Sequence, residues 1–323
     1  QSPCSVSGRY NAGRASTPYT VNAKGQGPAW SNSLFEDNAE FGYGMLLAQR
    51  AIRDGLKAKV EDVVANGTNE DVKAAGQEWL DTFAVGATNG AATDKLVAAL
   101  EACGCDKAKE ILAQKDFLAK KSQWIFGGDG WAYDIGFGGV DHVLASGRDI
   151  NVMVFDTEVY SNTGGQSSKS TPTGAIAQFA AGGKETKKKD MASIAMSYGY
   201  VYVAQISMGA DFNQTVKAIA EAEAYPGPSL IIAYAPCINH GIKKGMAKAQ
   251  TEEELAVKVG YWHNFRFNPA AEGNKFSLDS KAPSMEDYQA FLDGEVRYNS
   301  LKRQNPEKAA RLFAKNEAEA KAR

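Results

Sequence analysis

The sequence predicts an α/β fold, with a mostly parallel sheet flanked by helices, and three observations support this prediction. The apolar run W-I-F at 124–126 ends in G-G-D-G at 127–130, which is followed by residues with helical spacing. A second apolar run, at 150–155, ends in a polar, glycine-rich loop. Further apolar and helix-like runs then alternate up to residue 235. Such alternation is typical of parallel sheets, which bind ligands at the carboxyl ends of their strands.

The first fifty residues are expected to be loop-rich and then helical. Glycines and prolines interrupt residues 4–28 and forbid long regular elements there. A helix is predicted to open at Ser33, which together with Glu36 resembles a capping box.

Residues 57–121 are rich in alanine and charge and have helical periodicity, with apolar faces at 78–83 and 96–100. We expect a helical insertion that serves packing or dimer contact. Cys103 and Cys105 could bind a metal, but a lone C-x-C is weak evidence, and buried small apolar side chains are the favoured interpretation.

The segment after the second apolar run should continue the alternation. Thr173 is expected to cap a helix that starts at Gly174 and runs to 179. The basic run 184–190 is expected to be a solvated face, or alternatively to steer an acidic partner. The remaining predictions are helices at 190–198 and 213–224 and strands at 200–206 and 229–235.

The last part of the chain reads as mostly helical. T-E-E-E at 251–254 is another capping-box start. The stretch 285–323 is predicted to form two helical segments separated near Asn305-Pro306. Such an arm more often packs on a neighbour than carries chemistry.

Composition excludes several classes of protein. A chain of 323 residues can form one large or two smaller domains, and contents of 44% hydrophobic and 23% charged residues are ordinary for soluble proteins. The net charge of −2 argues against nucleic acid as an obligatory partner. No apolar run approaches the ~18 residues of a membrane span, and the start lacks a signal-peptide pattern. Four unevenly spaced cysteines do not form a secreted disulfide framework, so we expect a cytoplasmic enzyme or a piece of one.

The residues at the ends of the first two strands suit a diphosphate and its metal ion. Glycines on both sides of Asp129 let the backbone approach a phosphate, and the next helix offers its N-terminal N–H groups. Asp129 supplies a hard carboxylate oxygen for Mg²⁺, and Thr157 and the carbonyl of Val159 are plausible further oxygens. The tripeptide G-D-G alone would also fit a tight turn with a capping Asp.

Several longer segments together resemble one family. The G-D-G motif, with D-T-E-V-Y-S-N-T-G-G-Q at 156–166, resembles the thiamine-diphosphate fold of the 2-oxoacid:ferredoxin oxidoreductases. Residues 17–45, Y-A-P-C-I-N-H-G-I at 234–242 and G-E-V-R-Y-N-S-L-K-R-Q-N-P-E at 294–307 are similar to the homodimeric pyruvate:ferredoxin oxidoreductases in particular. The resemblance covers nearly the whole chain, except about residues 51–121.

The resemblance implies a reaction and its cofactors. Pyruvate would be oxidatively decarboxylated with coenzyme A to acetyl-CoA and CO₂. Electrons would pass from the thiamine-bound intermediate through 4Fe-4S clusters to ferredoxin or flavodoxin. Two alternatives remain: a non-redox thiamine-diphosphate-dependent 2-oxoacid decarboxylase or synthase, which needs no cluster, or an inactive cofactor-binding module when the section is isolated.

The resemblance also implies site residues. Asp129, Thr157 and Val159 would hold Mg²⁺, although the wider thiamine-enzyme pattern has Asn where Thr157 stands. Asn162 would hydrogen-bond the substrate or the intermediate and is the catalytic candidate. Other cofactor contacts would come from Gly128, Gly130, Trp131, Thr163, Gly165 and Phe35. Asn32 is a lesser candidate, since helix capping explains it as well, just as core packing explains Phe35.

Two cysteines align with cluster ligands in the resembling family. Cys4 and Cys237 would be two of the four thiolates of a 4Fe-4S cluster. The other two belong to a C-x-x-C segment that this sequence lacks, so the chain is expected to be one section of a longer polypeptide. C-S-V-S-G-R-Y after Cys4 departs from the family pattern. His240 is either a catalytic acid or base or, as we favour, a structural histidine.

The domain organisation follows from these predictions. Residues 1–56 and 122–260 would form the α/β domain that binds thiamine diphosphate and Mg²⁺. Residues 57–121 would form the helical insertion, and residues 261–323 a C-terminal arm that contacts the other subunit of a homodimer.

Overall fold

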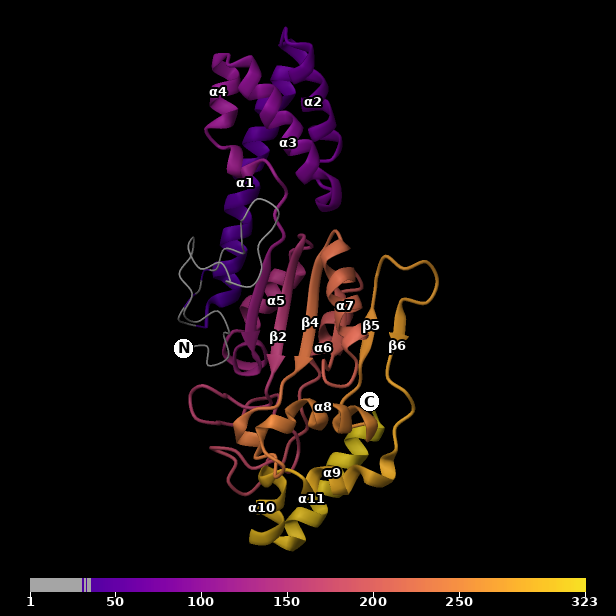
Figure 1. Cartoon of the computed structure of the whole chain (residues 1–323). Helices are drawn as coiled ribbons and strands as arrows, with labels where there is room; N and C mark the ends of the chain where they lie inside the picture. The colour runs from indigo at the N-terminus through magenta and orange to yellow at the C-terminus, as the bar shows by residue number, and fades with distance from the viewer. Residues whose placement is uncertain (1–30, 32, 34–35) are drawn as a thin grey trace. The chain divides into compact units, whose positions relative to one another are not determined.

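The computed structural model describes residues 31, 33 and 36–323 (Figure 1), and these residues form two compact units. The sheet unit comprises the described residues up to Phe41 together with Trp124–Arg323. The helical unit comprises Gly42–Gln123. Sequence analysis predicts an insertion at 57–121, whereas this division falls inside a continuous first helix.

The sheet unit is built on a six-stranded sheet in the order β1-β2-β4-β3-β5-β6. β1, β2, β4 and β3 are parallel, whereas β5 and β6 run antiparallel at one edge. The predicted mostly parallel α/β architecture is therefore confirmed. The bounds of the strands are β1 Trp124–Gly128, β2 Ile150–Asp156, β3 Tyr202–Ile206, β4 Pro228–Tyr234, β5 Phe265–Phe267 and β6 Phe276–Leu278.

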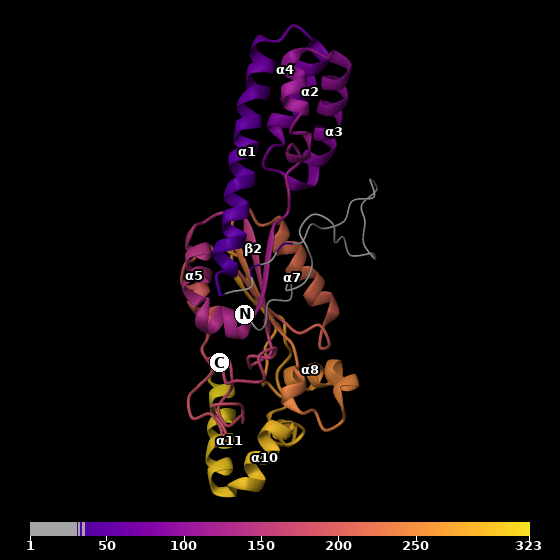
Figure 2. The ribbon, with the colours of Figure 1, turned by 90° about the vertical axis from the view of Figure 1, so that its left-hand side faces the viewer.

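Helices cover both faces of this sheet. α5 (Phe137–Ala145) and α7 (Phe212–Ala224) lie on opposite faces (Figure 2), and α6 (Met191–Met196) packs near β3 and β4. Two-sided coverage explains why β2 and β4 are almost continuously apolar and buried. The segment after β1 is a single π-helical turn, η2 (Gly130–Ile135), a rare form that is frequent at functional sites.

The C-terminal helices gather beyond the carboxyl ends of the parallel strands (Figure 1). Their bounds are η3 Ile238–His240, η4 Met246–Lys248, α8 Ala249–Lys258, η5 Met285–Asp287, α9 Tyr288–Asp293, α10 Val296–Gln304 and α11 Pro306–Lys321. The predicted break near Asn305-Pro306 lies between α10 and α11, where the Asn305 side chain accepts from the Lys308 N–H. The Asn316 amide donates to the Thr173 carbonyl at 2.6 Å, so α11 packs on the sheet unit itself.

The helical unit has its own core. It consists of most of α1 (Asn38–Asn66), with α2 (Glu70–Asp81), α3 (Gly86–Cys103), α4 (Asp106–Leu112) and η1 (Lys115–Phe117). Trp79 is fully buried there, and its indole N–H donates to the Leu118 carbonyl at 3.2 Å. The same carbonyl accepts from Arg53, whose guanidinium stacks over Phe83.

One predicted helix is absent. Residues 173–179 form turns and isolated bridges instead, because Gly174 has a φ of +83° and Phe179 a φ of +64°. The Thr173 hydroxyl donates to the Glu319 carboxylate rather than to a helix N-terminus. Local sequence suggested a cap, but contact with α11 decides the conformation.

Two other helix starts differ by several residues. α1 begins at Asn38, and the Ser33 hydroxyl donates to Asp37 rather than capping the helix. α8 begins at Ala249, so Thr251 lies inside the first turn. Neither of the two predicted capping boxes therefore caps its helix.

The expected burial of the C-x-C pair is also wrong. Cys105 is exposed and Cys103 only half-buried, because they flank the short connection between α3 and α4. Within the described ranges, no helix is both long and apolar enough to cross a bilayer.

Candidate functional site

Three loops meet at the carboxyl edge of neighbouring strands. Asp129 follows β1, residues 157–159 follow β2, and Cys237 follows β4. Because β1, β2 and β4 are adjacent in the sheet, their ends bring these polar residues together.

Asp129 is fully buried at this edge. Its Oδ1 accepts from the Thr157 N–H at 3.1 Å and lies 2.8 Å from Thr157 Oγ1, and its Oδ2 accepts from the Ser168 hydroxyl at 2.6 Å. Burial, and then repulsion from Asp156, raise the pKa of Asp129 to about 8. A nearby divalent cation would remove that penalty on the carboxylate.

Three oxygens form a compact cluster here. Thr157 Oγ1 lies 2.8 Å from Asp129 Oδ1 and 2.9 Å from the Val159 carbonyl oxygen. While Asp129 is ionised, the single hydroxyl hydrogen of Thr157 can serve only one of these two acceptors. Adjacent oxygens around an octahedral Mg²⁺, with bonds of about 2.0–2.1 Å, are about 2.9 Å apart. The spacing and the donor chemistry therefore fit Mg²⁺.

A buried ionic cluster lies directly behind these oxygens. Lys188 Nζ contacts Asp156 Oδ2 at 2.8 Å and Glu158 Oε1 at 3.0 Å, and its side chain is 9% exposed. Although burial opposes it, these two carboxylates raise the pKa of Lys188. Burial also opposes the ionised form of Glu158, yet Lys188 and Arg297 hold its pKa far below the ordinary value.

The basic run 184–190 is a solvated face only in part, because Glu185, Thr186, Lys187 and Asp190 are exposed whereas Lys188 and Lys189 make internal contacts. Lys188 is committed to internal carboxylates, and Lys189 donates to the Tyr133 carbonyl at 3.0 Å over the ring of Phe137. Lys187 alone of these three is exposed. Both interpretations of the run therefore fail at Lys188.

The turn after β4 contacts the loop after β2 twice. Cys237 is buried, and its sulfur lies 2.9 Å from the Ser161 hydroxyl and 3.4 Å from the Asn239 amide nitrogen. His240 Nε2 lies 3.0 Å from the Thr157 carbonyl oxygen. Burial and the nearby Arg297 lower the pKa of His240 to about 3, so its imidazole is neutral.

Neighbouring side chains leave no room for a Cβ atom at two of the predicted site glycines. A Cβ at Gly130 would lie 2.6 Å from the Tyr160 ring, and one at Gly165, where φ is +80°, would lie 2.7 Å from Asn239 Oδ1. Trp131 is fully buried and fills the space beside Gly136. Gly128, the last residue of β1, is buried at the same edge.

The remaining predicted residues lie at the tip of the loop or outside the described part. Asn162 and Thr163 are exposed, and the Thr163 hydroxyl donates to Gln166 at 2.5 Å. The structure therefore brings together Asp129, Thr157, Val159 and Cys237 and leaves Asn162 at the surface. Cys4, Asn32 and Phe35 lie outside the described residues.

Sequence reasoning missed the residues that support the cluster from behind. Ser168 donates to Asp129, and Glu158 lies between two predicted ligands while its side chain enters the core. The polar run S-S-K-S-T at 167–171 was an available signal for Ser168. For Glu158, the only signal in the sequence was its position between Thr157 and Val159, the two predicted metal ligands.

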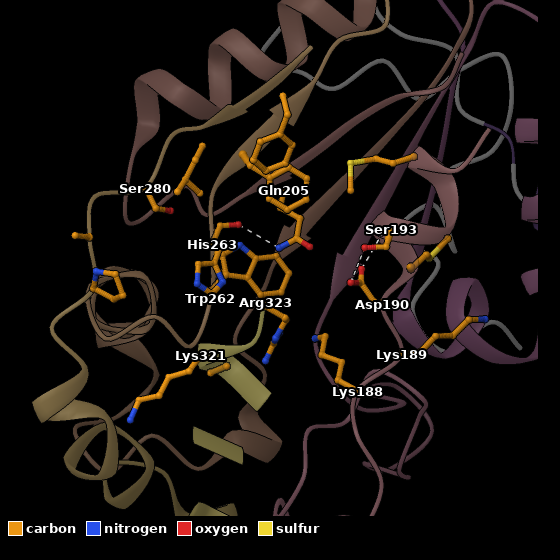
Figure 3. A pocket seen from close by; sticks show the side chains of 18 of the residues that line it. Lys188, Lys189, Asp190, Ser193, Gln205, Trp262, His263, Ser280, Lys321 and Arg323 are labelled. Carbon is orange, nitrogen blue, oxygen red and sulfur yellow. Dashed lines mark hydrogen bonds between the residues drawn. The ribbon is translucent and has the colours of Figure 1, made fainter. Parts of the chain in front are cut away.

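A separate cavity of about 460 Å³ lies beside Lys188 (Figure 3). Its walls include Trp262, His263, Lys321 and Arg323. None of the predicted site residues within the described ranges lines this cavity. The predicted site therefore lies at the strand edge and not in the cavity.

No clustering of three or more His, Cys, Asp or Glu side chains suitable for a metal is present among the described residues. The oxygen cluster is of another kind, since it combines one carboxylate with a hydroxyl and a carbonyl. Mg²⁺ commonly takes only one or two carboxylates from a protein, together with substrate phosphates and water.

Comparison with known proteins agrees with this geometry. Residues 83–233 match the thiamine pyrophosphate enzyme, C-terminal TPP binding domain, and thiamine pyrophosphate is another name for thiamine diphosphate. The match includes both strand ends that carry the oxygen cluster.

Three curated relatives are similar over almost the whole chain. Pyruvate-flavodoxin oxidoreductase of Enterobacter agglomerans is 57% identical over 97% of this chain and 28% of its own length. The Klebsiella pneumoniae protein of the same name is 54% identical, over 97% of this chain and 27% of its own. Pyruvate:ferredoxin oxidoreductase of Moorella thermoacetica is 57% identical, over 95% of this chain and 27% of its own.

The chain spans little more than a quarter of the length of these relatives. Almost its whole length is nevertheless matched by them, and the matched domain carries the oxygen cluster. The chain is therefore similar, over almost its whole length, to one section of the pyruvate-flavodoxin and pyruvate:ferredoxin oxidoreductases, and it contains a match to a thiamine-diphosphate-binding domain.

Proposed function

We propose that this chain is the section of a pyruvate oxidoreductase that holds thiamine diphosphate and Mg²⁺. The complete enzyme would decarboxylate pyruvate oxidatively with coenzyme A and pass electrons to flavodoxin or ferredoxin. The observation that carries the proposal is the oxygen cluster of Asp129, Thr157 and Val159 inside the matched domain. The names of the relatives supply pyruvate and the electron acceptors.

The residues at the strand edge would have different roles in binding Mg²⁺ and thiamine diphosphate. Asp129, Thr157 and the Val159 carbonyl would hold Mg²⁺ and, through it, the diphosphate. The buried Trp131 and the tightly packed Gly130 would exclude water from the floor of the site. Thiamine diphosphate, when bound, supplies the nucleophilic carbon and the electron sink that decarboxylation needs.

The exposed tip of the loop would meet the substrate. Asn162 has an amide that can both donate and accept, which suits a carboxylate and a keto oxygen on one small molecule. Thr163 and Gly165, together with Phe35 from outside the described residues, would complete the cofactor contacts.

Cys237 and Cys4 are proposed as two of the four ligands of a 4Fe-4S cluster. The described residues offer only the Cys237 thiol at this edge, whereas a cluster needs four thiolates. This part of the chain therefore does not form a cluster site by itself, and the remaining ligands would come from outside it. A homodimeric assembly is likewise proposed from the family resemblance.

Calorimetric binding of Mg²⁺ and thiamine diphosphate to the complete protein that carries this chain tests the proposal. Asp129→Asn should weaken binding by about 100-fold or more, because loss of a ligand charge should cost at least as much as loss of an outer-shell partner. Glu254→Gln, on the exposed side of α8, is the control and should bind as the unmodified protein does. Absence of binding to the unmodified protein, or unchanged binding by the Asp129→Asn protein, would sink the proposal.

Iron content and low-temperature EPR separate the redox enzyme from a non-redox decarboxylase. Reducible 4Fe-4S signals that respond to pyruvate and coenzyme A are expected. Thiamine diphosphate bound without iron in anaerobically prepared complete protein would favour the non-redox alternative.

A further inference from the structure

Glu158 occupies an unusual place in the backbone. It lies between Thr157 and Val159, and its φ is +59°, in the left-handed region. In the described part of the chain only one other non-glycine residue, Phe179, has a positive φ. A side chain in this region costs about 1 kcal/mol or more, so neighbouring contacts must hold it there.

The Glu158 carboxylate is fixed by three donors from distant parts of the chain. Its Oε1 accepts from Lys188 at 3.0 Å, and its Oε2 accepts from Arg297 and from the Tyr261 hydroxyl, each at 2.7 Å. The residue is 1% exposed. Arg297 is held in turn by Glu295, with Nε to Oε2 at 2.7 Å.

The backbone around Glu158 is equally constrained. Its N–H donates to Asp156 Oδ1 at 3.1 Å, and its carbonyl accepts from the Thr171 hydroxyl at 2.5 Å. The preceding carbonyl, of Thr157, lies 3.0 Å from His240 Nε2. A carbonyl oxygen can only accept, so this ring nitrogen carries the hydrogen.

The consequence of this conformation is geometric. The left-handed residue turns the chain so that Thr157 Oγ1 and the Val159 carbonyl lie 2.9 Å apart beside Asp129. The Glu158 side chain meanwhile enters the core. The orientation of both oxygens therefore depends on the clamp at the residue between them.

We propose that Glu158 is a positioning residue for the metal site, clamped by Lys188 and Arg297 so that the oxygens of its two neighbours face a bound Mg²⁺. This inference rests on the proposed function and deepens it, because it makes cofactor affinity depend on α10 and on the segment after α8. Replacing a buried ion pair by apolar residues often leaves stability unchanged, so the cluster is better explained by the geometry it fixes.

Glu158→Gln in the complete protein tests the clamp. Glutamine keeps the size of the side chain but loses the charge that binds Lys188 and Arg297. The dissociation constants of Mg²⁺ alone and of thiamine diphosphate with Mg²⁺ should rise by about 10- to 100-fold, the range found for outer-shell partners. Circular dichroism should show the fold intact.

Glu253→Gln is the matched control. Glu253 is also a buried glutamate, but its carboxylate accepts from Ser207 and Gly209, away from the loop. The Glu253→Gln protein should bind metal and cofactor as the unmodified protein does.

A second variant separates the clamp from the backbone strain. Glu158→Gly relieves the strain at a positive φ and leaves Lys188 paired with Asp156 and Arg297 with Glu295. It should still bind metal more weakly, because the loop is no longer anchored. If the unmodified protein binds metal and cofactor and both Glu158 variants bind them as tightly as it does, the inference is overturned while the proposed function stands. If the unmodified protein does not bind, the proposed function itself fails.

Discussion

At the scale of the residue, three buried carboxyl groups differ because their neighbours differ. Glu158 faces Lys188 and Arg297, which hold its pKa far below the ordinary value despite burial. Asp129 and Glu253 have no cation as close, so burial raises the pKa of both. The ionised form of a buried acid is therefore favoured where the fold supplies a cationic partner and disfavoured where it does not.

Glu253 gives a prediction on pH dependence. Its pKa is raised in the folded protein, so its contribution to stability is fully present below pH 4.5 and is lost as the pH rises through the folded pKa. Glutamine can still accept from Ser207 and Gly209 without carrying a charge. The Glu253→Gln protein should gain stability relative to the unmodified protein as the pH rises.

Denaturant unfolding of both proteins between pH 4 and 8 measures this effect. A difference in unfolding free energy that does not change with pH would contradict the prediction.

At the scale of the element, the start of a helix depends on whether its capping side chain is free to accept a hydrogen bond from the backbone of the first turn. Asn69, Asp211 and Asn305 each accept from a backbone N–H three residues later. Thr173 has the right chemistry, but its hydroxyl is taken by Glu319 of α11. The same local signal thus gives a cap in one place and a loop in another.

The connection between α3 and α4 gives a prediction on thiol chemistry. Cys103 and Cys105 have sulfurs 3.0 Å apart. A hydrogen bond from Cys103, together with the Ala108 N–H, lowers the pKa of Cys105, whereas the contact raises the pKa of Cys103. Cys105 is therefore the expected nucleophile.

Oxidised glutathione should convert this pair to an internal disulfide. The Cys105 thiolate attacks the glutathione disulfide and releases one glutathione, and Cys103 then displaces the second. Peptide mass spectrometry should show the loss of two hydrogens, whereas the Cys103→Ser protein should stop at the mixed disulfide on Cys105. A mixed disulfide that persists equally in both proteins would refute the prediction.

At the scale of the whole molecule, the chain forms two units of different construction. The helical unit packs around Trp79 and the sheet unit around the parallel strands. The C-terminal helices return to the carboxyl edge of the sheet, where Arg297 and Tyr261 reach Glu158. The proposed cofactor site is thus built from segments that are far apart in the sequence.

Cofactor binding should therefore protect the sheet unit in particular. At 100 times the dissociation constant, thiamine diphosphate with Mg²⁺ should stabilise the folded protein by about 2.7 kcal/mol. Hydrogen exchange should slow in residues 126–166 and in the segment around Arg297. Residues 70–112 of the helical unit should exchange unchanged, and equal slowing there would contradict a site confined to the strand edge.

The sequence by itself determined the fold class and the position of Asp129 and Thr157 at the strand ends. The almost continuously apolar runs of β2 and β4 favour burial on both faces, and Asp129 and Thr157 come directly after the ends of their strands. Local composition could not determine the fate of Lys188, of residues 173–179 or of Glu158. A lysine run is ordinarily solvated, and a positive φ at glutamate is ordinarily unfavourable.

Only the tertiary structure decided these points. The Lys188 side chain is almost fully enclosed because it forms ion pairs with Asp156 and Glu158. Residues 173–179 form turns because α11 packs against them. Glu158 adopts its conformation because Arg297, more than a hundred residues later in the sequence, completes its anchor. Such contacts join segments with no local relation, and their energies outweigh the roughly 1 kcal/mol preferences from which local structure is predicted.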